Sequence, residues 1–405
     1  PAVAPDTGHG VNGFAKDNVA TSGKISSYTR GSMAPRPIRT ASAPLDETVR
    51  VPGSKSVTHR ALVLAALANG ASTLEHPLDA DDTRATAIGL RALGVDVELG
   101  AGRWIVDGRG GRIPGGGTID LAQSGSSMRF LAAVAALGQR PTELDGHPRL
   151  RERPMGELYD VLRRLGADVL SPDDGRALPA RIGRGVIRGG RVEVSCARSS
   201  QFLTALLLVA ARLPGGIVAR VDGPAVSMPY VDLTCGLLRE FGIEVGVEAG
   251  RYRVEPCAYP GRTARIEGDH SSASCLLAAG AIVGGRVRVE GLRPDSLQPD
   301  ARFCSLLASL GCAVETGESF VEVRGGAGLE GFDVDLADAP DLAPAVVALA
   351  LFARGSTRVR GIAHLRYKES DRPAVLADNL RALGCPAQVT DRELIVGPVD
   401  PGALR

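Results

Sequence analysis

The stretch LRALGVDV, residues 90–97, decides the fold because close variants of it recur along the chain. Each copy places a leucine or phenylalanine before a glycine, and this apolar residue falls at positions 93, 165, 241, 310 and 383. The other copies are LRRLGADV (162–169), LREFGIEV (238–245), LASLGCAV (307–314) and LRALGCPA (380–387). The pattern predicts that each copy ends an amphipathic helix, with the glycine just past its end, and then leads into a strand. The sequence therefore predicts a repeat of about 70 residues.

A second and more apolar helix is predicted upstream in each copy. These segments open with small polar residues and continue with alanine and leucine, as in SKSVTHRALVLAALANG (54–70), SGSSMRFLAAVAALG (124–138), SSQFLTALLLVAARL (199–213), SSASCLLAAGAIVGG (271–285) and PDLAPAVVALALFARG (340–355). Such helices are apolar on nearly all sides, so we expect them to be buried with sheets outside them. This inverts the usual α/β order of a sheet inside and helices outside.

The repeats predict an α/β protein of two lobes. We assign three units, in residues 53–262, to one lobe, and residues 36–52 plus 263–405, with two units, to the other. Five copies is an odd number for two lobes, so either the second lobe is smaller or a sixth copy is missing. Residues 1–35 are rich in Gly, Ser, Asp and Pro and lack apolar periodicity, which predicts a disordered tail.

Composition excludes several classes of function. The 405 residues carry a net charge of +1, with 44% hydrophobic and 23% charged residues. This balance is typical of a soluble globular protein and gives no support for nucleic-acid or membrane binding. The apolar runs are too short to cross a bilayer. The seven cysteines form no C-x-x-C pair, so we expect reduced thiols, no metal site and a cytoplasmic location.

The openings of the apolar helices are candidate anion sites. Serine hydroxyls and free backbone N–H groups at a helix N-terminus favour negative charge. Any one such serine could simply cap its helix, but several openings also carry cations. Ser56 and Arg60 are four residues apart, and Arg129 lies one turn into the second of these helices. Together they suggest a cleft that holds a phosphorylated small molecule.

Lysine is scarce and falls at informative places. The chain has only four lysines, two in the N-terminal tail and two in GSKS (Lys55) and RYKESDR (Lys368). Lys368 and Arg372 are spaced to share one helix face, where they would repel unless an anion lies between them; a salt-bridged surface helix with Glu369 is the alternative. Unlike Arg, a Lys buried among cations has a lowered pKa and can move protons.

At these residues the chain resembles the 3-phosphoshikimate 1-carboxyvinyltransferase family. The motifs are PGSKSVTHRAL (52–62), LDADDT (78–83), LDGHPRLRERP (144–154), SSQFLTALLL (199–208), SMPYVDLT (227–234) and HLRYKESDR (364–372). The resemblance implies a two-lobed inverse α/β barrel with three repeats in each lobe. It implies transfer of the enolpyruvyl group of phosphoenolpyruvate to the 5-hydroxyl of shikimate 3-phosphate, with release of phosphate. No cofactor, no metal and a monomeric cytoplasmic enzyme are implied.

The resemblance also implies roles for particular residues. Lys55 would contact both substrates, and Asp341 and Glu369 would be the acid/base carboxylates. Lys368 would lie near the reacting hydroxyl, and His364 stands where many members have Asn. The shikimate 3-phosphate pocket would be formed by Ser56, Arg60, Ser199, Ser200, Gln201, Ser227 and Tyr230. The phosphoenolpyruvate site would include Gly125, Arg153 and Arg372.

The end of the chain departs from the family pattern. Members continue into a sixth repeat with a D-H-R motif and a late lysine, whereas this sequence stops at ELIVGPVDPGALR (393–405). We therefore expect weak phosphoenolpyruvate binding and slow turnover. One alternative is a truncated remnant that still binds shikimate 3-phosphate. Another is UDP-N-acetylglucosamine 1-carboxyvinyltransferase, which GSKS, KESDR and the absence of a cysteine near PRLRERP argue against, and a generic phosphate-binding module is a further one.

Overall fold

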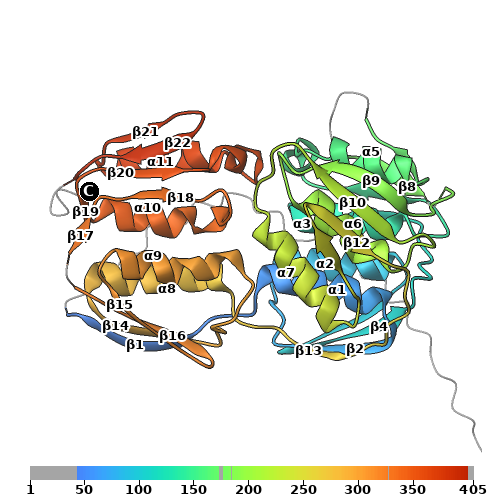
Figure 1. The fold of residues 1–405 in the computed structure, drawn as a ribbon, viewed down its shortest axis with the longest axis horizontal. Coiled ribbons are helices and arrows are strands. Elements are labelled where there is room, and N and C mark those ends of the chain that lie inside the picture. Colours follow the sequence, from blue (N-terminus) through green and yellow to red (C-terminus); the bar gives the residue numbers. More distant parts are fainter. Residues whose placement is uncertain (1–42, 173–176, 184, 327, 400–405) are drawn as a thin grey trace, which may run out of the picture. The chain divides into compact units, whose positions relative to one another are not determined.

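The computed structural model describes residues 43–399 except 173–176, 184 and 327. The predicted disordered tail, residues 1–35, lies outside the described residues. The described chain belongs to one compact unit, residues 41–405. It alternates helices and strands from β1 (Leu45–Arg50) to β22 (Glu393–Val396) (Figure 1).

The recurring Leu/Phe–Gly signature ends a helix in all five copies, as predicted. The leucine or phenylalanine is the C-cap residue in each case, and the glycine after it takes a positive φ of 80° to 100°. A side chain on Cβ disfavours that conformation, whereas glycine adopts it without penalty. The helices that end this way are α2 (Asp81–Ala92), α5 (Gly156–Arg164), α7 (Pro229–Glu240), α9 (Phe303–Ser309) and α11 (Arg372–Ala382).

Three units lie between residues 55 and 254. The first adds α1 (Lys55–Leu67), β2 (Asn69–Glu75), β3 (Asp96–Gly100) and β4 (Arg103–Arg109). The second adds β5 (Thr118–Asp120), α3 (Gly125–Ala135), β6 (Thr142–Asp145), α4 (Pro148–Arg151), β7 (Asp168–Leu170) and β8 (Ala180–Gly183). The third adds β9 (Gly190–Ser195), α6 (Gln201–Ala210), β10 (Ile217–Asp222), β11 (Gly246–Glu248) and β12 (Arg251–Val254).

Two more units follow β13 (Thr263–Arg265). The fourth contains α8 (His270–Val283), β14 (Gly285–Glu290), the 3₁₀ helix η1 (Pro299–Arg302), β15 (Ala313–Gly317) and β16 (Phe320–Gly325). The fifth contains β17 (Leu329–Glu330), β18 (Asp333–Asp335), η2 (Pro340–Leu342), α10 (Ala343–Leu351), β19 (Ala353–Arg354), β20 (Thr357–Arg360), η3 (Ala363–Tyr367) and β21 (Ala387–Val389).

The sheets repeat one topology. Within the described ranges, five sheets have four strands each, and a sixth contains only β17 and β19. In every four-stranded sheet one parallel pair is followed by two antiparallel pairs, as in β5-β6-β8-β7. Five copies of one sequence signature thus accompany five copies of one sheet.

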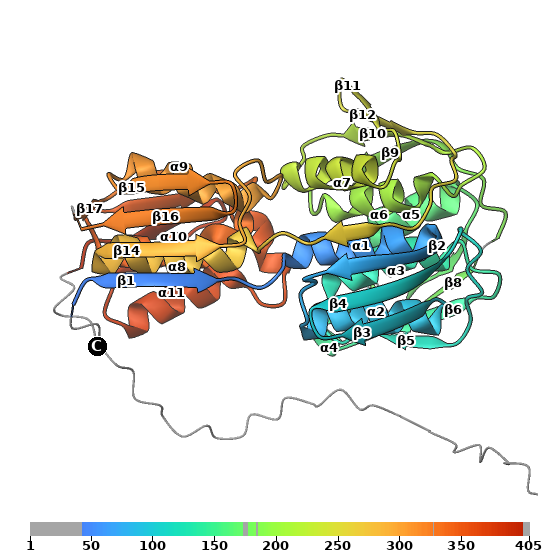
Figure 2. The same ribbon diagram turned by 90° about the horizontal axis from the view of Figure 1, so that it is seen from below.

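Two strands complete sheets far away in the chain. β1 pairs in parallel with β14, and β13 pairs in parallel with β2. Figure 2 shows β1 lying beside β14, in the other half of the molecule from the helix α1 that follows it in sequence. The two connecting segments run past each other, with Ser54 N–H donating to Glu267 O at 2.8 Å and Asp269 N–H to Pro52 O at 2.9 Å.

Two hydrophobic clusters form the interior. One draws its residues from 57–266, and the other from Val51 and 273–396. The predicted burial of the apolar helices is confirmed most fully for α1, α3 and α6, which bury nearly every residue, whereas α8 buries only half of its residues. This arrangement supports the proposed lobes, 53–262 and 36–52 plus 263–405, whose boundaries stay a prediction. Over the described ranges no helix is both long and apolar enough to cross a membrane.

Candidate active site

One pocket brings together every candidate site residue predicted from the sequence. It is lined by Lys55, Ser56, Arg60, Gly125, Arg153, Ser199, Ser200, Gln201, Ser227, Tyr230, Asp341, His364, Lys368, Glu369 and Arg372. These residues come from the starts of α1, α3, α6, α7 and α11, from the segment between α4 and α5, and from the irregular segments around η2 and η3. Lys55 and Lys368, more than 300 positions apart, therefore face the same space.

Helix N-termini on the first lobe's side open into this pocket, in part as predicted. Ser54 caps α1 by accepting the Val57 N–H, and Ser124 caps α3 by accepting the Ser127 N–H. Ser200 precedes α6, but its hydroxyl donates to Ser227 O at 2.9 Å instead of capping the helix. The pattern does not extend to the other two helices. Asp269 caps α8, and η2 precedes α10.

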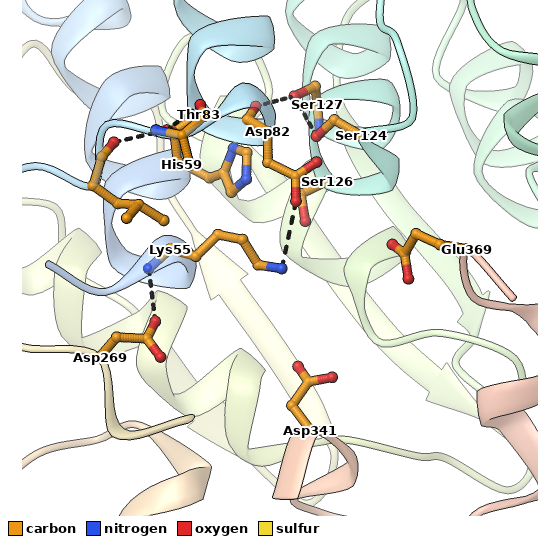
Figure 3. Close-up of polar contacts among 12 residues, drawn as sticks. Lys55, His59, Asp82, Thr83, Ser124, Ser126, Ser127, Asp269, Asp341 and Glu369 are labelled. Carbon is orange, nitrogen blue, oxygen red and sulfur yellow. Dashed lines mark hydrogen bonds and ion pairs between the residues drawn. The ribbon is translucent and has the colours of Figure 1, made fainter. Parts of the chain in front are cut away.

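Lys55 lies among carboxylates (Figure 3). Its backbone N–H donates to Asp269 Oδ2 at 2.9 Å, and its ammonium group lies 3.4 Å from Asp82 Oδ2. Burial disfavours the charge, but Asp341, Asp82 and other nearby carboxylates outweigh it, so the pKa of Lys55 is raised above its usual value. The expected lowering of a buried lysine pKa is therefore wrong for Lys55, and this ammonium group stays charged.

Lys368 behaves in the opposite way. Burial lowers its pKa, and the charges of Arg372 and Arg153 act in the same direction while Asp341 opposes them. The predicted shared helix face with Arg372 is wrong, because Lys368 follows η3 and Arg372 begins α11. Asp371 separates η3 from α11, because its side chain caps α11 by accepting the Ala374 N–H. The break lets Lys368, Glu369 and Arg372 line one pocket despite their closeness in sequence.

Both predicted acid/base carboxylates are held by arginines. Arg372 donates to Asp341 Oδ1 at 2.7 Å and lies 3.5 Å from Glu369 Oε2, while Arg153 donates to Glu369 Oε1 at 3.0 Å. Burial would raise both pKa values, but Lys368 and Arg372 hold the pKa of Asp341 well below its usual range. Arg153 and the neighbouring cations likewise lower the pKa of Glu369. Both groups are therefore carboxylates at neutral pH.

Three buried arginines form the floor of the pocket. Arg60 donates to Thr234 Oγ1 and to the carbonyls of Ser56 and Tyr230, which leaves two of its five N–H groups for a ligand. Arg129 donates to Gln201 Oε1 at 2.8 Å and stacks over Phe202. The Arg153 guanidinium lies against Gly125.

Gly125 is required by this packing. A Cβ atom there would lie 2.3 Å from the Arg153 guanidinium, closer than nonbonded atoms can approach. Any side chain at position 125 must therefore displace Arg153, which links the two residues assigned to one substrate site.

Polar side chains complete the wall opposite Lys368. Gln201 donates to Ser126 Oγ at 3.0 Å, and the Ser199 hydroxyl accepts the Gln201 N–H. Ser227 lies 3.4 Å from His364 Nε2, and burial lowers the pKa of His364 to about 4, so its ring is neutral at pH 7. The Tyr230 hydroxyl lies 3.2 Å from Asp341 Oδ2. These contacts connect residues 199–230 with residues 341–364.

Sequence reasoning assigned no site role to several residues that line the pocket, namely Asp82, Ser126, Pro154, Arg198 and Tyr367. Asp82 belongs to the LDADDT motif, whose position at a helix start was an available signal. Arg129, predicted from the sequence as a cation at a helix opening, also lines the pocket. Arg198 and Tyr367 adjoin predicted site residues in sequence, but nothing in their pattern separates them from ordinary surface residues.

The balance of charge defines what the pocket can hold. Counted over the described residues, seven lysines and arginines face three carboxylates. Because these groups pair across the pocket, its free volume is about 70 Å³, well below the roughly 300 Å³ at which ligand pockets begin. Anionic ligands would have to replace the ion pairs. Within the same ranges no cluster of three or more His, Cys, Asp or Glu side chains is arranged to hold a metal.

Comparisons with known proteins identify the family of this chain. Residues 39–403 match the family model described as EPSP synthase (3-phosphoshikimate 1-carboxyvinyltransferase). The chain is 42% identical to the 3-phosphoshikimate 1-carboxyvinyltransferase of Methanoculleus marisnigri, over 88% of this chain and 85% of that protein. It is 41% identical to the enzyme of the same name from Salmonella arizonae, over 88% and 84%.

A solved structure shares the fold. The EPSP synthase of Acinetobacter baumannii superposes with a TM-score of 0.72 at 25% identity, over 88% of this chain and 83% of that one. The family match extends over nearly the whole chain, and the relatives exceed 40% identity. This chain belongs to the EPSP synthase (3-phosphoshikimate 1-carboxyvinyltransferase) family.

Proposed function

We propose that this chain transfers the enolpyruvyl group of phosphoenolpyruvate to the 5-hydroxyl of shikimate 3-phosphate, releasing phosphate, in the synthesis of chorismate and aromatic amino acids. Family membership supports the reaction. The observation that carries the proposal is the single pocket where seven basic side chains meet three carboxylates. Two phosphorylated substrates bring several negative charges, which such an excess of cations can balance.

The proposed division of roles follows the charge. Lys55 stays an ammonium group and, with Arg60 and the serines at 199, 200 and 227, binds phosphate and hydroxyl groups. Arg153 and Arg372 bind phosphoenolpyruvate and stabilise the phosphate as it leaves. Asp341, ionised beside Lys368, accepts the proton of the attacking hydroxyl.

Glu369 is proposed to deliver a proton to the methylene carbon of phosphoenolpyruvate. In the ligand-free chain Arg153 and Arg372 keep its pKa low. An anionic substrate on those two arginines would offset their charge, so the pKa of Glu369 would rise when the substrate binds. Binding of the donor would therefore prepare the acid that the reaction needs.

The test offers the purified chain phosphoenolpyruvate with either shikimate 3-phosphate or UDP-N-acetylglucosamine. We expect phosphate release with the first acceptor only. Turnover with the second would favour the sister enzyme instead. Binding of shikimate 3-phosphate by calorimetry, with no turnover at any phosphoenolpyruvate concentration, would identify the chain as the impaired remnant.

A monomer in the cytoplasm is part of the proposal. The family resemblance supports the monomer, and the use of two small charged metabolites supports the location. Sedimentation of the purified chain at several concentrations tests the oligomeric state, and a concentration-dependent mass would contradict it.

A further inference from the structure

A second buried carboxyl group lies behind Asp341. Asp300, in η1, is only 4% exposed, and the hydroxyl of Tyr230 lies 3.1 Å from its Oδ2 atom. The same hydroxyl lies 3.2 Å from Asp341 Oδ2. Tyr230 therefore bridges the proposed base and a carboxyl group that does not line the substrate pocket.

The bridge needs one more hydrogen than Tyr230 has. A phenol donates a single hydrogen, so it can bond only one of two ionised carboxylates. The other contact would then place two unshared oxygen atoms about 3 Å apart in a buried site, which is repulsive. Both contacts become hydrogen bonds if one carboxyl group is protonated and donates to the tyrosine oxygen.

The surroundings indicate which carboxyl group holds the proton. Asp341 is bonded to Arg372, and Lys368 and Lys55 are its other cationic neighbours. Asp300 faces the carboxylates Asp341 and Asp269, which raise its pKa, and the charge of Lys368 opposes them more weakly. Lys55 and Arg372 line the cavity beside Asp300, a space of about 410 Å³. The other carboxyl oxygen of Asp300, Oδ1, has no hydrogen-bond partner among the described residues.

Resting on the proposed function, we propose that Asp300 is a positioning residue: it stays protonated, donates to Tyr230, and so makes Tyr230 donate to Asp341. The Asp341 carboxylate is thereby fixed as the base for the acceptor hydroxyl. As the acceptor oxygen bonds to the enolpyruvyl carbon, its O–H bond breaks and the proton passes to Asp341. The proton on Asp300 is not consumed. Two carboxyl groups in one site take opposite states because their environments differ.

This arrangement should depend on pH. Burial, followed by the charge of Asp341, raises the pKa of Asp300 to about 8. Above that pH Asp300 loses its proton and competes for the single Tyr230 hydrogen, so Asp341 loses its donor. We expect kcat to fall on the alkaline side with an apparent pKa of about 8.

Two substitutions separate this role from simple packing. Asn at position 300 is neutral and can donate to Tyr230 at every pH, whereas Ala cannot. At about pH 6.5 we expect D300N to keep kcat within roughly threefold of the wild type and D300A to lose about thirtyfold. D300N should lack the alkaline decline. Asp295→Asn, at an exposed site on the loop before η1, is the matched control and should behave as the wild type.

Combining Asp300→Ala with Tyr230→Phe tests the coupling. If Asp300 acts through Tyr230, the double variant should lose little more kcat than the larger of the single losses. Additive losses would mean that the two side chains act independently, which would overturn the proposal. The proposal is equally overturned if D300N is as inactive as D300A, or if D300N keeps the wild-type alkaline decline.

An infrared titration needs no turnover. The wild type should show the stretch of a protonated carboxyl group at neutral pH, lost above about pH 8 and absent from D300N. If the chain proves inactive but shows this band, the proposed function fails, while the protonated Asp300 and its hydrogen bond to Tyr230 stand. If the chain is active and the band is missing, only the inference fails.

Discussion

The two sides of the active-site pocket are built differently. Residues 55–230 supply five of its cations and one carboxylate, whereas residues 341–372 supply two cations and two carboxylates. The first side consists mainly of helix starts anchored in a dense core, and its arginines at 60, 129 and 153 are buried. The second side consists of irregular segments around η2 and η3, where the Glu369 side chain is 42% exposed. The difference fits the proposed roles, in which the first wall mainly binds anions and the second wall supplies the groups that transfer protons.

The repeated helices are also buried to different extents in the two regions of the molecule. α1 buries 11 of its 13 residues, but α8 buries only 7 of its 14, counted over the described part of the chain. The repeated apolar C-cap residue is buried at Leu93, Leu165 and Phe241, yet Leu383 is 36% exposed. The same local pattern can therefore yield a tight core or a looser one, depending on what packs against it.

Substituting one carboxylate on each wall should give the largest contrast. Asp341→Asn removes the proposed base, so we expect kcat to fall about 1,000-fold, within the usual range for general-base loss. Asp82→Asn removes only a neighbour of Lys55, and we expect a loss of about tenfold. Steady-state assays measure both. Equal losses would contradict the division of labour between the walls.

A pair of leucine truncations compares the two cores. Leu207 is fully buried in α6, and Leu207→Ala should lower the free energy of unfolding by about 3 kcal/mol through lost burial and a cavity. Leu276 in α8 is only partly buried, so Leu276→Ala should lower it by about 1 kcal/mol or less. Urea denaturation of both variants gives the comparison. A larger effect at Leu276 would show that α8 is more tightly packed than its exposure indicates.

A glycine pair probes the anion-binding wall. Gly125→Ala pushes Arg153 aside, so we expect the KM for phosphoenolpyruvate to rise roughly tenfold. Gly156→Ala, at the start of α5, meets no atom within 4 Å and is the matched control. It should leave KM unchanged and add a few tenths of a kcal/mol to stability, about what a helical Gly-to-Ala change provides. An unchanged KM in Gly125→Ala would argue against Arg153 as a substrate ligand.

A further comparison concerns the pH dependence of stability at His59 in the first core. Burial lowers the pKa of His59 to about 3, with Lys55 and Arg60 acting the same way and Asp82 opposing them. The unfolded chain binds a proton at this residue below its usual pKa of about 6.5, so stability falls as the pH drops from there toward about 3. The slope from this residue is at most about 1.4 kcal/mol per pH unit.

His59→Gln should be less stable than the wild type at neutral pH but should lose less stability on acidification. Unfolding curves at a series of pH values measure the change. If the stability of the two proteins falls equally with pH, His59 is not the group responsible for the acid destabilisation.

The repeat, the buried helices and the pocket residues could be predicted from the sequence, because each has a local signature. The Leu/Phe–Gly copies mark helix ends, and the motifs around Lys55 and Lys368 carry the family resemblance. What the sequence could not reveal depends on contacts across the molecule. Asp82 raises the pKa of Lys55 only because the two come together in space, and the bridge from Asp300 to Asp341 joins residues on three elements. The break after Lys368 arises from Asp371 capping α11, which a helical spacing argument overlooks.

The pairing of β1 with β14 has a consequence for how the protein is made. Leu45 pairs with Gly285, 240 residues later, and a ribosome adding about 5–20 residues per second needs roughly 10–50 s to synthesise that interval. β1 emerges first but has no partner until most of the polypeptide exists. The hydrophobic cluster of residues 57–266 can close earlier, when β13 reaches β2. Chain growth thus imposes an order of assembly in which β1 waits longer for its first partner than any other described strand.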